Sequence, residues 1–331
     1  LNIKKGDEVI VPAMTFVATA NVVEILGAKP IFVDCDPETL LVDQKKIFKA
    51  LNKKTKAIFV VHLYGNMFDV NKLKKNLKKI KSKTKIIEDA AHSFESKLHG
   101  NKVGKYSDIS IFSFYATKNI TCAEGGAIIT NNKKLFNLIK QTRSHGLSKN
   151  FTERFETKKY SHWNMNTLGT KANLPDILAA FLPPQIDNIY NNLNKRTKAY
   201  NFYKQKLKDT NIRFQKINTD CLSSLYLFPI HVKVGIRDKL LAFLNENNIA
   251  CTINYNSVTQ LNYYKKKYNL KDKDYKNAIN WGKGTLSLPF YPDIKKKTQS
   301  YEFYSKNLNH KNLIIFYKKF NSHIDLKEKY D

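Results

Sequence analysis

The sequence predicts an α/β protein, with a large domain built on a mostly parallel, mixed sheet flanked by helices and a smaller C-terminal α+β domain. Over the first half, short apolar runs typical of buried strands alternate with apolar residues at helical spacing. After Asp187 the pattern changes to one long helix followed by a strand, a helix and a strand. At 331 residues the chain exceeds one typical domain, so we expect domains at 1–187 and 188–331.

The elements of the large domain follow from the spacing of apolar residues. Strands are predicted at Glu8–Val11, Pro30–Val33, Ala57–Val61, Lys85–Glu88, Ile109–Phe114 and Gly126–Thr130. Helices are predicted at Phe16–Leu26, Val42–Leu51, Asn71–Ile80 and Leu135–Thr142. In the second domain we predict helices at Asn188–Leu207 and Asp238–Asn247, and strands at Leu225–Val232 and Ala250–Tyr255.

Several chemically active side chains follow the predicted strands directly. Phe16 comes after the first strand, Asp89 and His92 after the fourth, and Ser113 and Lys118 after the fifth. Ligands of parallel sheets bind at the carboxyl ends of the strands, so these residues are expected to share one crevice. A neutral lysine above an apolar floor forms Schiff bases with carbonyl compounds, and a serine hydroxyl suits an anion. The alternatives are that Lys118 is one of 52 ordinary surface lysines and that Asp89 caps a helix.

The formal net charge of +29 raises the question of nucleic acid. The excess is almost all lysine, scattered among asparagines and at helical spacing along Lys72–Lys79, which is typical of a solvated helix face. Tyr263, Tyr264, Tyr268 and Tyr275 lie among lysines, a pattern that also occurs in single-strand binders, but no recognisable nucleic-acid module surrounds them. Nucleic acid is therefore not the expected partner.

The four cysteines stand far apart and form no metal-binding or disulfide spacing, which predicts reduced thiols in a cytoplasmic protein without a metal site. No signal peptide or membrane-spanning apolar run is present in the sequence, so no membrane partner is expected. The chain opens on a turn and strand without an initiator methionine, which predicts an N-terminally incomplete large domain.

A set of segments carries a family resemblance. The segments are GDEVIVPAMTF, IFVDCD, VHLYG, EDAAHS, SFYATKNITCAEGGAIITNN, RSHGLSK and LSLPFYP, in this order from residue 1 to residue 292. They resemble the DegT/DnrJ/EryC1/StrS family of nucleotide-sugar aminotransferases. The resemblance implies the aspartate aminotransferase fold, which is fold type I of the pyridoxal 5'-phosphate enzymes. A family loop of Gly-Thr-x-Ala type, which holds the cofactor phosphate, has no match in this sequence.

The resemblance implies a role for each residue at the strand ends. Lys118 matches the lysine that forms a Schiff base with the cofactor and moves the substrate proton. Asp89 matches the carboxylate that pairs with the pyridine nitrogen and keeps it protonated. His92 matches the residue beside the phenolic oxygen of the cofactor, Phe16 the aromatic that stacks on its ring, and Ser113 a phosphate ligand.

A second segment resembles the part of the family that crosses to a neighbouring subunit. It spans residues 164–187, where Lys171 matches a family asparagine or lysine that reaches the partner's cofactor phosphate and Asn173 lies close by. The alternative for Lys171 is a solvated lysine. The resemblance implies a homodimer with shared active sites.

The expected activity is transfer of an amino group, with L-glutamate as donor, to a nucleotide-linked keto-deoxy sugar, with 4-amino-4,6-dideoxy sugars as the products most similar members make. Three positions depart from the family pattern: Glu95 replaces a glycine, and Tyr226 and Asn254 replace histidines. One alternative is a non-aminating member of the family, which Lys118 argues against because such members have histidine there. The other is a catalytically impaired paralogue that acts as a dimeric binding protein.

Overall fold

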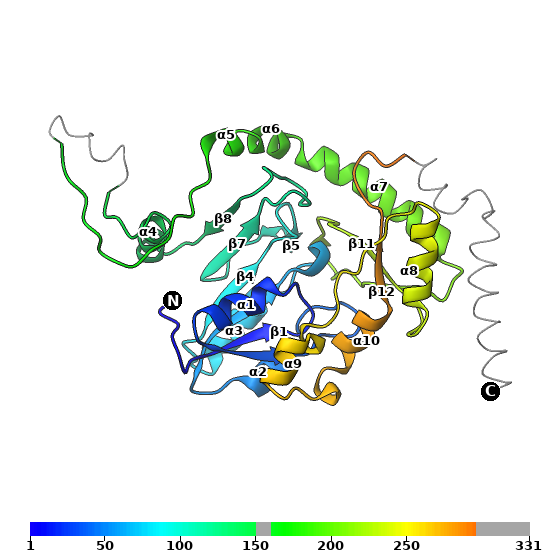
Figure 1. Cartoon of the computed structure of the whole chain (residues 1–331), viewed down its shortest axis with the longest axis horizontal. Helices are drawn as coiled ribbons and strands as arrows, with labels where there is room; N and C mark the ends of the chain where they lie inside the picture. The colour runs from blue at the N-terminus through cyan, green and yellow to red at the C-terminus, as the bar shows by residue number, and fades with distance from the viewer. Residues whose placement is uncertain (150–159, 296–331) are drawn as a thin grey trace.

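The computed structural model describes residues 1–149 and 160–295 of the chain. Its centre is a sheet in the order β2 (Lys29–Val33), β1 (Glu8–Pro12), β3 (Thr55–Val61), β4 (Lys85–Asp89), β7 (Ile109–Ser113) and β8 (Gly126–Ile129) (Figure 1). All neighbours pair in parallel except β7 and β8, which are antiparallel. The predicted fold class is confirmed, because six strands within one to two residues of their expected bounds form a mixed, mostly parallel sheet.

Helices flank the strands, and side-chain caps explain where three of the four begin. They are α1 (Ala18–Ile25), α2 (Gln44–Ala50), α3 (Val70–Lys79) and α4 (Lys133–Thr142). The side chains of Asp43, Asp69 and Asn132 accept hydrogen bonds from backbone N–H groups in the first turns of α2, α3 and α4. Such caps satisfy donors that a helix start leaves unpaired, so they fix where each helix begins.

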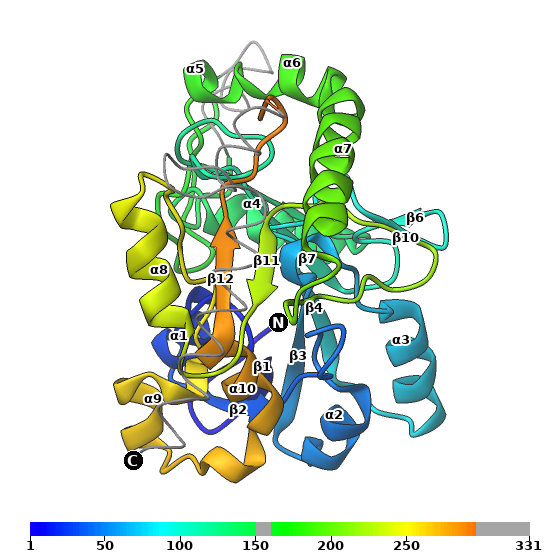
Figure 2. The ribbon, with the colours of Figure 1, turned by 90° about the vertical axis from the view of Figure 1, so that its right-hand side faces the viewer.

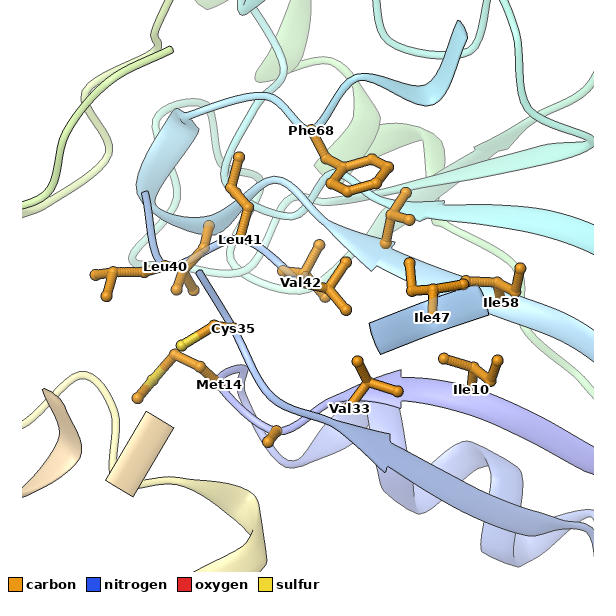
Figure 3. Packing of buried hydrophobic residues seen from close by; sticks show 14 of the residues in the cluster. Ile10, Met14, Val33, Cys35, Leu40, Leu41, Val42, Ile47, Ile58 and Phe68 are labelled. Carbon is orange, nitrogen blue, oxygen red and sulfur yellow. The ribbon is translucent and has the colours of Figure 1, made fainter. Parts of the chain in front are cut away.

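The inner strands β1 and β3 are buried on both faces of the sheet. Ile10, Val33 and Ile58 point to one face and pack with Ile47 of α2, as Figure 3 shows (Figure 3). Val9 and Val11, the neighbours of Ile10, belong to a separate cluster on the other face with Ala20 and Val23 of α1. Because side chains alternate along a strand, two covered faces require an almost continuous apolar run, which is what the sequence has at β1 and β3.

A helical segment leads from the sheet to the rest of the chain. It comprises α5 (Asp176–Ala179), α6 (Leu182–Asp187) and the long α7 (Ile189–Leu207), which run along one side of the molecule in Figure 1. The α7 prediction differs from the structure by one residue at its start. The region around α4 projects beyond the sheet at the end opposite to α7.

The C-terminal sheet contains β9 (Arg213–Phe214), β11 (Phe228–His231) and β12 (Thr285–Leu288), all antiparallel, with α8 (Arg237–Glu246) against it (Figure 2). Its core includes Tyr203 of α7, Phe228, Leu240 and Leu286. The predicted strand at Ala250–Tyr255 is wrong, because only Thr252 pairs there, in an isolated bridge to Ser287. The place beside β11 is taken instead by β12, which lies about thirty residues further along the chain.

After residue 255 the chain returns to the first sheet. It forms η3 (Val258–Gln260), α9 (Asn262–Lys267), η4 (Asp272–Asp274) and α10 (Lys276–Gly284). Ala278 and Trp281 of α10 join the core of the first sheet, and Tyr264 of α9 joins the cluster over α1. The division at residue 187 stays a prediction, and the part of the second domain at 296–331 lies outside the described residues.

Smaller features complete the picture. A three-stranded sheet joins β10 (Cys221–Leu222), β5 (Lys97–Leu98) and β6 (Asn101–Lys102), and η1 (Leu63–Gly65) follows β3. All four cysteines are free thiols. Among the described residues, no helix has the length and apolar character needed to cross a membrane.

The tyrosines between 263 and 268 donate hydrogen bonds to other residues of the protein. The hydroxyls of Tyr263 and Tyr268 donate to the carboxylate of Glu24 in α1, and that of Tyr264 donates to Asn21 Oδ1 at 2.6 Å. Tyr264 is buried. These bonds tie α9 and the residue after it to α1, which favours a structural role for the cluster.

Candidate active site

Five of the seven predicted site residues lie at or just beyond the carboxyl ends of β1, β4 and β7. Phe16 follows β1, Asp89 ends β4, His92 lies three residues further, Ser113 ends β7, and Lys118 lies in the loop between β7 and β8. The parallel register pairs Val61 with Asp89 and Asp89 with Ile111, so these ends stand side by side. The position agrees with the place where sheets of this type bind ligands.

The carboxylate of Asp89 is oriented by two hydrogen bonds. Thr19 Oγ1 donates to Asp89 Oδ2 at 2.8 Å, and the backbone N–H of Ala91 donates to Oδ1 at 3.1 Å. Thr15 Oγ1 lies 3.1 Å from Thr19 Oγ1 and continues the chain of hydroxyls. The Asp89 side chain is therefore held in one orientation, and each carboxylate oxygen keeps a lone pair for a further donor.

His92 is a buried, neutral histidine. Its Nδ1 accepts from the backbone N–H of Tyr64 at 3.2 Å, so its proton lies on Nε2, which is 3.3 Å from the hydroxyl of Tyr255. Burial holds the pKa of His92 well below its usual range, and the charge of Lys118 acts in the same direction. The imidazole ring is sandwiched in an aromatic cluster, with the ring of Tyr226 stacked at 4.2 Å and 17°.

Lys118 extends toward this cluster. Its Nζ lies over the ring of Tyr226, 4.6 Å from the centroid, and 3.4 Å from the Tyr226 hydroxyl. The side chain is half-buried. The prediction that Lys118 lies in a loop between two strands is confirmed, and its role as the Schiff-base lysine stays a prediction.

Phe16 and Ser113 present groups at the edges of the site. The Phe16 ring is 54% exposed and its inner edge packs at 5.7 Å against Tyr255. Ser113 Oγ accepts from the backbone N–H of Tyr115 at 3.3 Å, which leaves the hydroxyl proton of Ser113 available to an acceptor. An exposed aromatic ring after β1 and a hydroxyl donor at the end of β7 therefore stand on either side of β3 and β4.

Lys171 and Asn173 are not gathered with the other five. Both are exposed, and Lys171 forms an isolated backbone bridge with Ser144 in the region that follows α4. Within the described ranges no contact joins either residue to Lys118 or Asp89. Their role in the site thus stays a prediction that depends on a second copy of the chain.

A buried ion pair, which the sequence did not predict, is hydrogen-bonded to the loop that carries Lys118. Arg196 of α7 pairs with Glu95, and Asn119, the neighbour of Lys118, donates to Glu95 Oε1 at 2.9 Å. Arg196 Nε also donates to the carbonyl of Ser224 at 3.0 Å. Two features of the sequence could have indicated this pair. Glu95 stands at a family glycine position, and Arg196, one of only five arginines in the chain, stands in a lysine-rich helix.

Thr19 was also not predicted, since a threonine in a helical pattern gives no sign of a contact with a residue seventy positions away.

The structure also contains a cavity of about 680 Å³ between the starts of α2 and α3, lined by Asp43, Phe48, Phe68, Asp69 and others. Its lining includes none of the predicted site residues.

Comparison with known proteins identifies a family and several relatives of the chain. A family model described as the DegT/DnrJ/EryC1/StrS aminotransferase family matches residues 1–301. The chain is 31% identical over 299 residues to an uncharacterized protein of Methanocaldococcus jannaschii, covering 89% of this chain and 77% of that protein. It is 30% identical over 295 residues to the spore coat polysaccharide biosynthesis protein SpsC of Bacillus subtilis, covering 87% and 75%.

Solved structures agree with this relationship. The PMP form of a sugar aminotransferase described as putative, Spr1654 of Streptococcus pneumoniae, superimposes with a TM-score of 0.84 at 25% identity, over 91% of this chain and 80% of that one. The Helicobacter pylori aminotransferase PseC, involved in the biosynthesis of pseudoaminic acid, gives a TM-score of 0.79 at 28% identity, over 90% and 78%. With Lys118, Asp89 and His92 at the strand ends of this fold, the chain belongs to the DegT/DnrJ/EryC1/StrS aminotransferase family.

Proposed function

We propose that this protein transfers an amino group from L-glutamate to a nucleotide-linked keto-deoxy sugar, of which a 4-keto-6-deoxy sugar is the first candidate, for the biosynthesis of amino sugars and polysaccharides. The observation that carries the proposal is the convergence of Lys118, Asp89 and the His92 cluster at one sheet edge. The sugar is supported by relatives that are described as sugar aminotransferases and by SpsC, described as a polysaccharide biosynthesis protein.

The residues present fit pyridoxal 5'-phosphate, the cofactor of the family. The pyridine nitrogen needs an anionic acceptor, and Asp89 offers a carboxylate that Thr19 and the Ala91 N–H hold in place. The ring needs an aromatic face, and Phe16 is more than half exposed. The aldehyde needs an amine, and Lys118 supplies one beside the same cluster. The donor set therefore matches the chemistry of the cofactor at each of these points.

When bound, the cofactor supplies an aldehyde for the donor amine and a protonated ring that withdraws electrons from the neighbouring carbon. Asp89 keeps the ring nitrogen protonated through a charge-assisted hydrogen bond. Lys118 Nζ would hold the aldehyde, and its free amine would act as the base that takes up the proton given up by the donor carbon. The Ser113 hydroxyl would donate a hydrogen bond to the phosphate, and the Phe16 ring would cover one ring face against water.

We also propose a homodimer in which each site is completed by the partner. Lys171 and Asn173 lie in a region that carries several exposed apolar side chains, including Leu168 at 85% and Ile177 at 76% exposure. The others in this region are Phe136, Leu138, Met165 and Phe181. Exposed apolar side chains gathered on one part of a chain favour an interface, and a second copy covers them while bringing Lys171 to a phosphate.

The experiment that tests the function has two steps. The purified protein is mixed with pyridoxal phosphate, and a visible absorbance band is expected that Lys118→Ala lacks. L-Glutamate should then bleach the band, and UDP-, GDP- or dTDP-linked keto sugars should restore it, one of them fastest. A protein that folds but shows no band would instead support the impaired, dimeric binding paralogue.

A further inference from the structure

The Lys118 amine does not stand alone in this site, because one tyrosine contacts it in two ways. We propose that Tyr226 is a catalytic residue whose hydroxyl, together with that of Thr117, holds the Lys118 amine for proton transfer in both of its protonation states. The proposal rests on the proposed function of Lys118 and adds a residue to it.

The geometry places the Tyr226 hydroxyl at the amine and the Thr117 hydroxyl beside that of Tyr226. Lys118 Nζ is 4.6 Å from the centroid of the Tyr226 ring and 3.4 Å from its hydroxyl, and Thr117 Oγ1 lies 3.2 Å from the same hydroxyl. The ring face attracts an ammonium group, and the attraction grows when water is excluded. Tyr226 is only 8% exposed, so the tyrosine side of both contacts is shielded from bulk water.

The pair of hydroxyls can satisfy the amine whether it is charged or neutral. When Lys118 is an ammonium it donates to the Tyr226 oxygen, and the Tyr226 proton points to Thr117 Oγ1. When Lys118 is neutral, the Tyr226 proton points to Nζ and the Thr117 proton replaces it on the Tyr226 oxygen. A proton can therefore leave or reach Nζ without leaving a half-buried polar atom unpaired, which would otherwise slow the transfer.

Tyr226 is itself held rigidly. Its ring stacks on His92, and Leu225 before it adopts a left-handed backbone with φ of 49° that non-glycine residues rarely take. The segment packs so closely on Gly65 that a Cβ there would lie 2.2 Å from Ser224 Oγ. The fold thus accepts a strained residue and a glycine in order to seat this tyrosine, which favours a functional reason for its position.

A purely packing role for Tyr226 would need only its ring. Tyr226→Phe separates the two roles, because phenylalanine keeps the stacking on His92 and the ring face toward Lys118 but lacks the hydroxyl. Thr117→Val removes the second hydroxyl at an exposed residue, where the substitution does not disturb the core. Tyr200→Phe is the matched control, since it removes a tyrosine hydroxyl in the C-terminal core.

The test is carried out first on the protein without cofactor. Each lysine is labelled with formaldehyde and a mild reductant, and the labelling rates are measured by mass spectrometry of the peptides. We expect Lys118 to react about fivefold faster in Tyr226→Phe, the change that loss of one net hydrogen bond predicts. In Thr117→Val we expect about twofold, and in Tyr200→Phe no change. Lys46, which pairs with Asp34 at 2.8 Å, should keep its rate in all proteins.

The test is then repeated with cofactor and donor. Tyr226→Phe should keep the visible band and the KM for glutamate but lose about tenfold in kcat, with a larger isotope effect for donor deuterated at the reacting carbon. Unchanged labelling of Lys118 in Tyr226→Phe overturns the proposal, and if that variant does not fold, unchanged labelling in Thr117→Val does so. A wild-type protein without a band contradicts the proposed function instead, because the labelling is measured without cofactor.

Discussion

At the scale of single residues, the orientation of Asp89 is the clearest link between sequence and chemistry. The strand pattern placed Asp89 at a carboxyl end, and the structure adds the two donors that orient it, Thr19 Oγ1 and the Ala91 N–H. The alternative that Asp89 caps a helix does not hold, because the residues directly after Asp89 form a turn and no helix. The carboxylate is thus free to serve a ligand.

Asp89→Asn should weaken binding of pyridoxal phosphate by about 10- to 100-fold, because a charge-assisted hydrogen bond of roughly 1.5–3 kcal/mol is replaced by a weaker one. The dissociation constant is measured by absorbance titration. Asp69→Asn is the matched control, since asparagine also caps a helix and Asp69 lies at the start of α3. Equal affinity of Asp89→Asn and wild type would remove Asp89 from the cofactor site.

The burial of His92 predicts a pH dependence of stability. Its pKa is held below that of the unfolded chain, so between the two values the unfolded state binds more protons and folding loses stability as the pH falls. Below about pH 6.5 the free energy of unfolding should decline by up to about 1.4 kcal/mol per pH unit from this residue. Burial lowers the pKa of His231 as well, which adds a smaller effect in the same direction.

Urea denaturation at pH 7.5 and pH 5.5 measures this decline. The difference between the two pH values should shrink in His92→Gln compared with wild type. A difference of the same size in both proteins would show that His92 is not the group that titrates.

At the scale of elements, α7 supports the loop of Lys118 through the buried pair of Arg196 and Glu95. Burial raises the pKa of Glu95 and lowers that of Arg196, so the pair is stable only while each side chain has the other. Through Asn119 and Ser224 the same pair connects the loop of Lys118 with the segment of Tyr226. The position of Lys118, the proposed catalytic amine, therefore depends on a helix to which no chemical role is assigned.

Arg196→Met should lower the free energy of unfolding by about 3–5 kcal/mol, because it leaves the Glu95 carboxylate buried without its charged partner. Replacing Glu95 by Leu in the same chain should recover much of the loss. Lys195→Met, which breaks an exposed pair with Asp293, is the control and should cost no more than about 1 kcal/mol. The values come from urea denaturation, and a loss equal to that of the control would mean that the buried pair does not stabilise the fold.

The sequence predicted those elements whose pattern is local. The strands of the first sheet and helices α2, α3 and α7 carry regular apolar spacing and, for α2 and α3, an aspartate cap, so their bounds came out within a few residues. The strand predicted at Ala250–Tyr255 failed because pairing depends on where β12 arrives, which no local pattern encodes. The contacts by which Arg196 supports the loop of Lys118 and Thr19 orients Asp89 were not predicted for the same reason, since they join distant parts of the chain.

At the scale of the whole molecule, the seven predicted site residues divide into two groups. Five lie at one sheet edge, and Lys171 and Asn173 stand exposed on the region beyond α4 together with exposed apolar side chains. A dimer with exchanged contributions explains both facts. It also predicts a result that a monomer with one complete site does not give.

Lys118→Ala and Lys171→Glu should each have little activity alone, because each homodimer has two defective sites. When the two proteins are unfolded together and refolded as a mixture, half of the dimers are hybrids with one intact site each. About a quarter of the wild-type activity is then expected. Sedimentation checks that dimers have formed, and a mixture no more active than its components would exclude shared sites.

The central claim is that one lysine among 52, Lys118, binds the cofactor. The most direct measurement is reduction of the protein with borohydride in the presence of pyridoxal phosphate, followed by digestion and mass spectrometry. The account predicts a stoichiometric pyridoxyl group on the peptide that contains Lys118, absent from Lys118→Ala. A modification spread over surface lysines, or concentrated on another lysine, would contradict it.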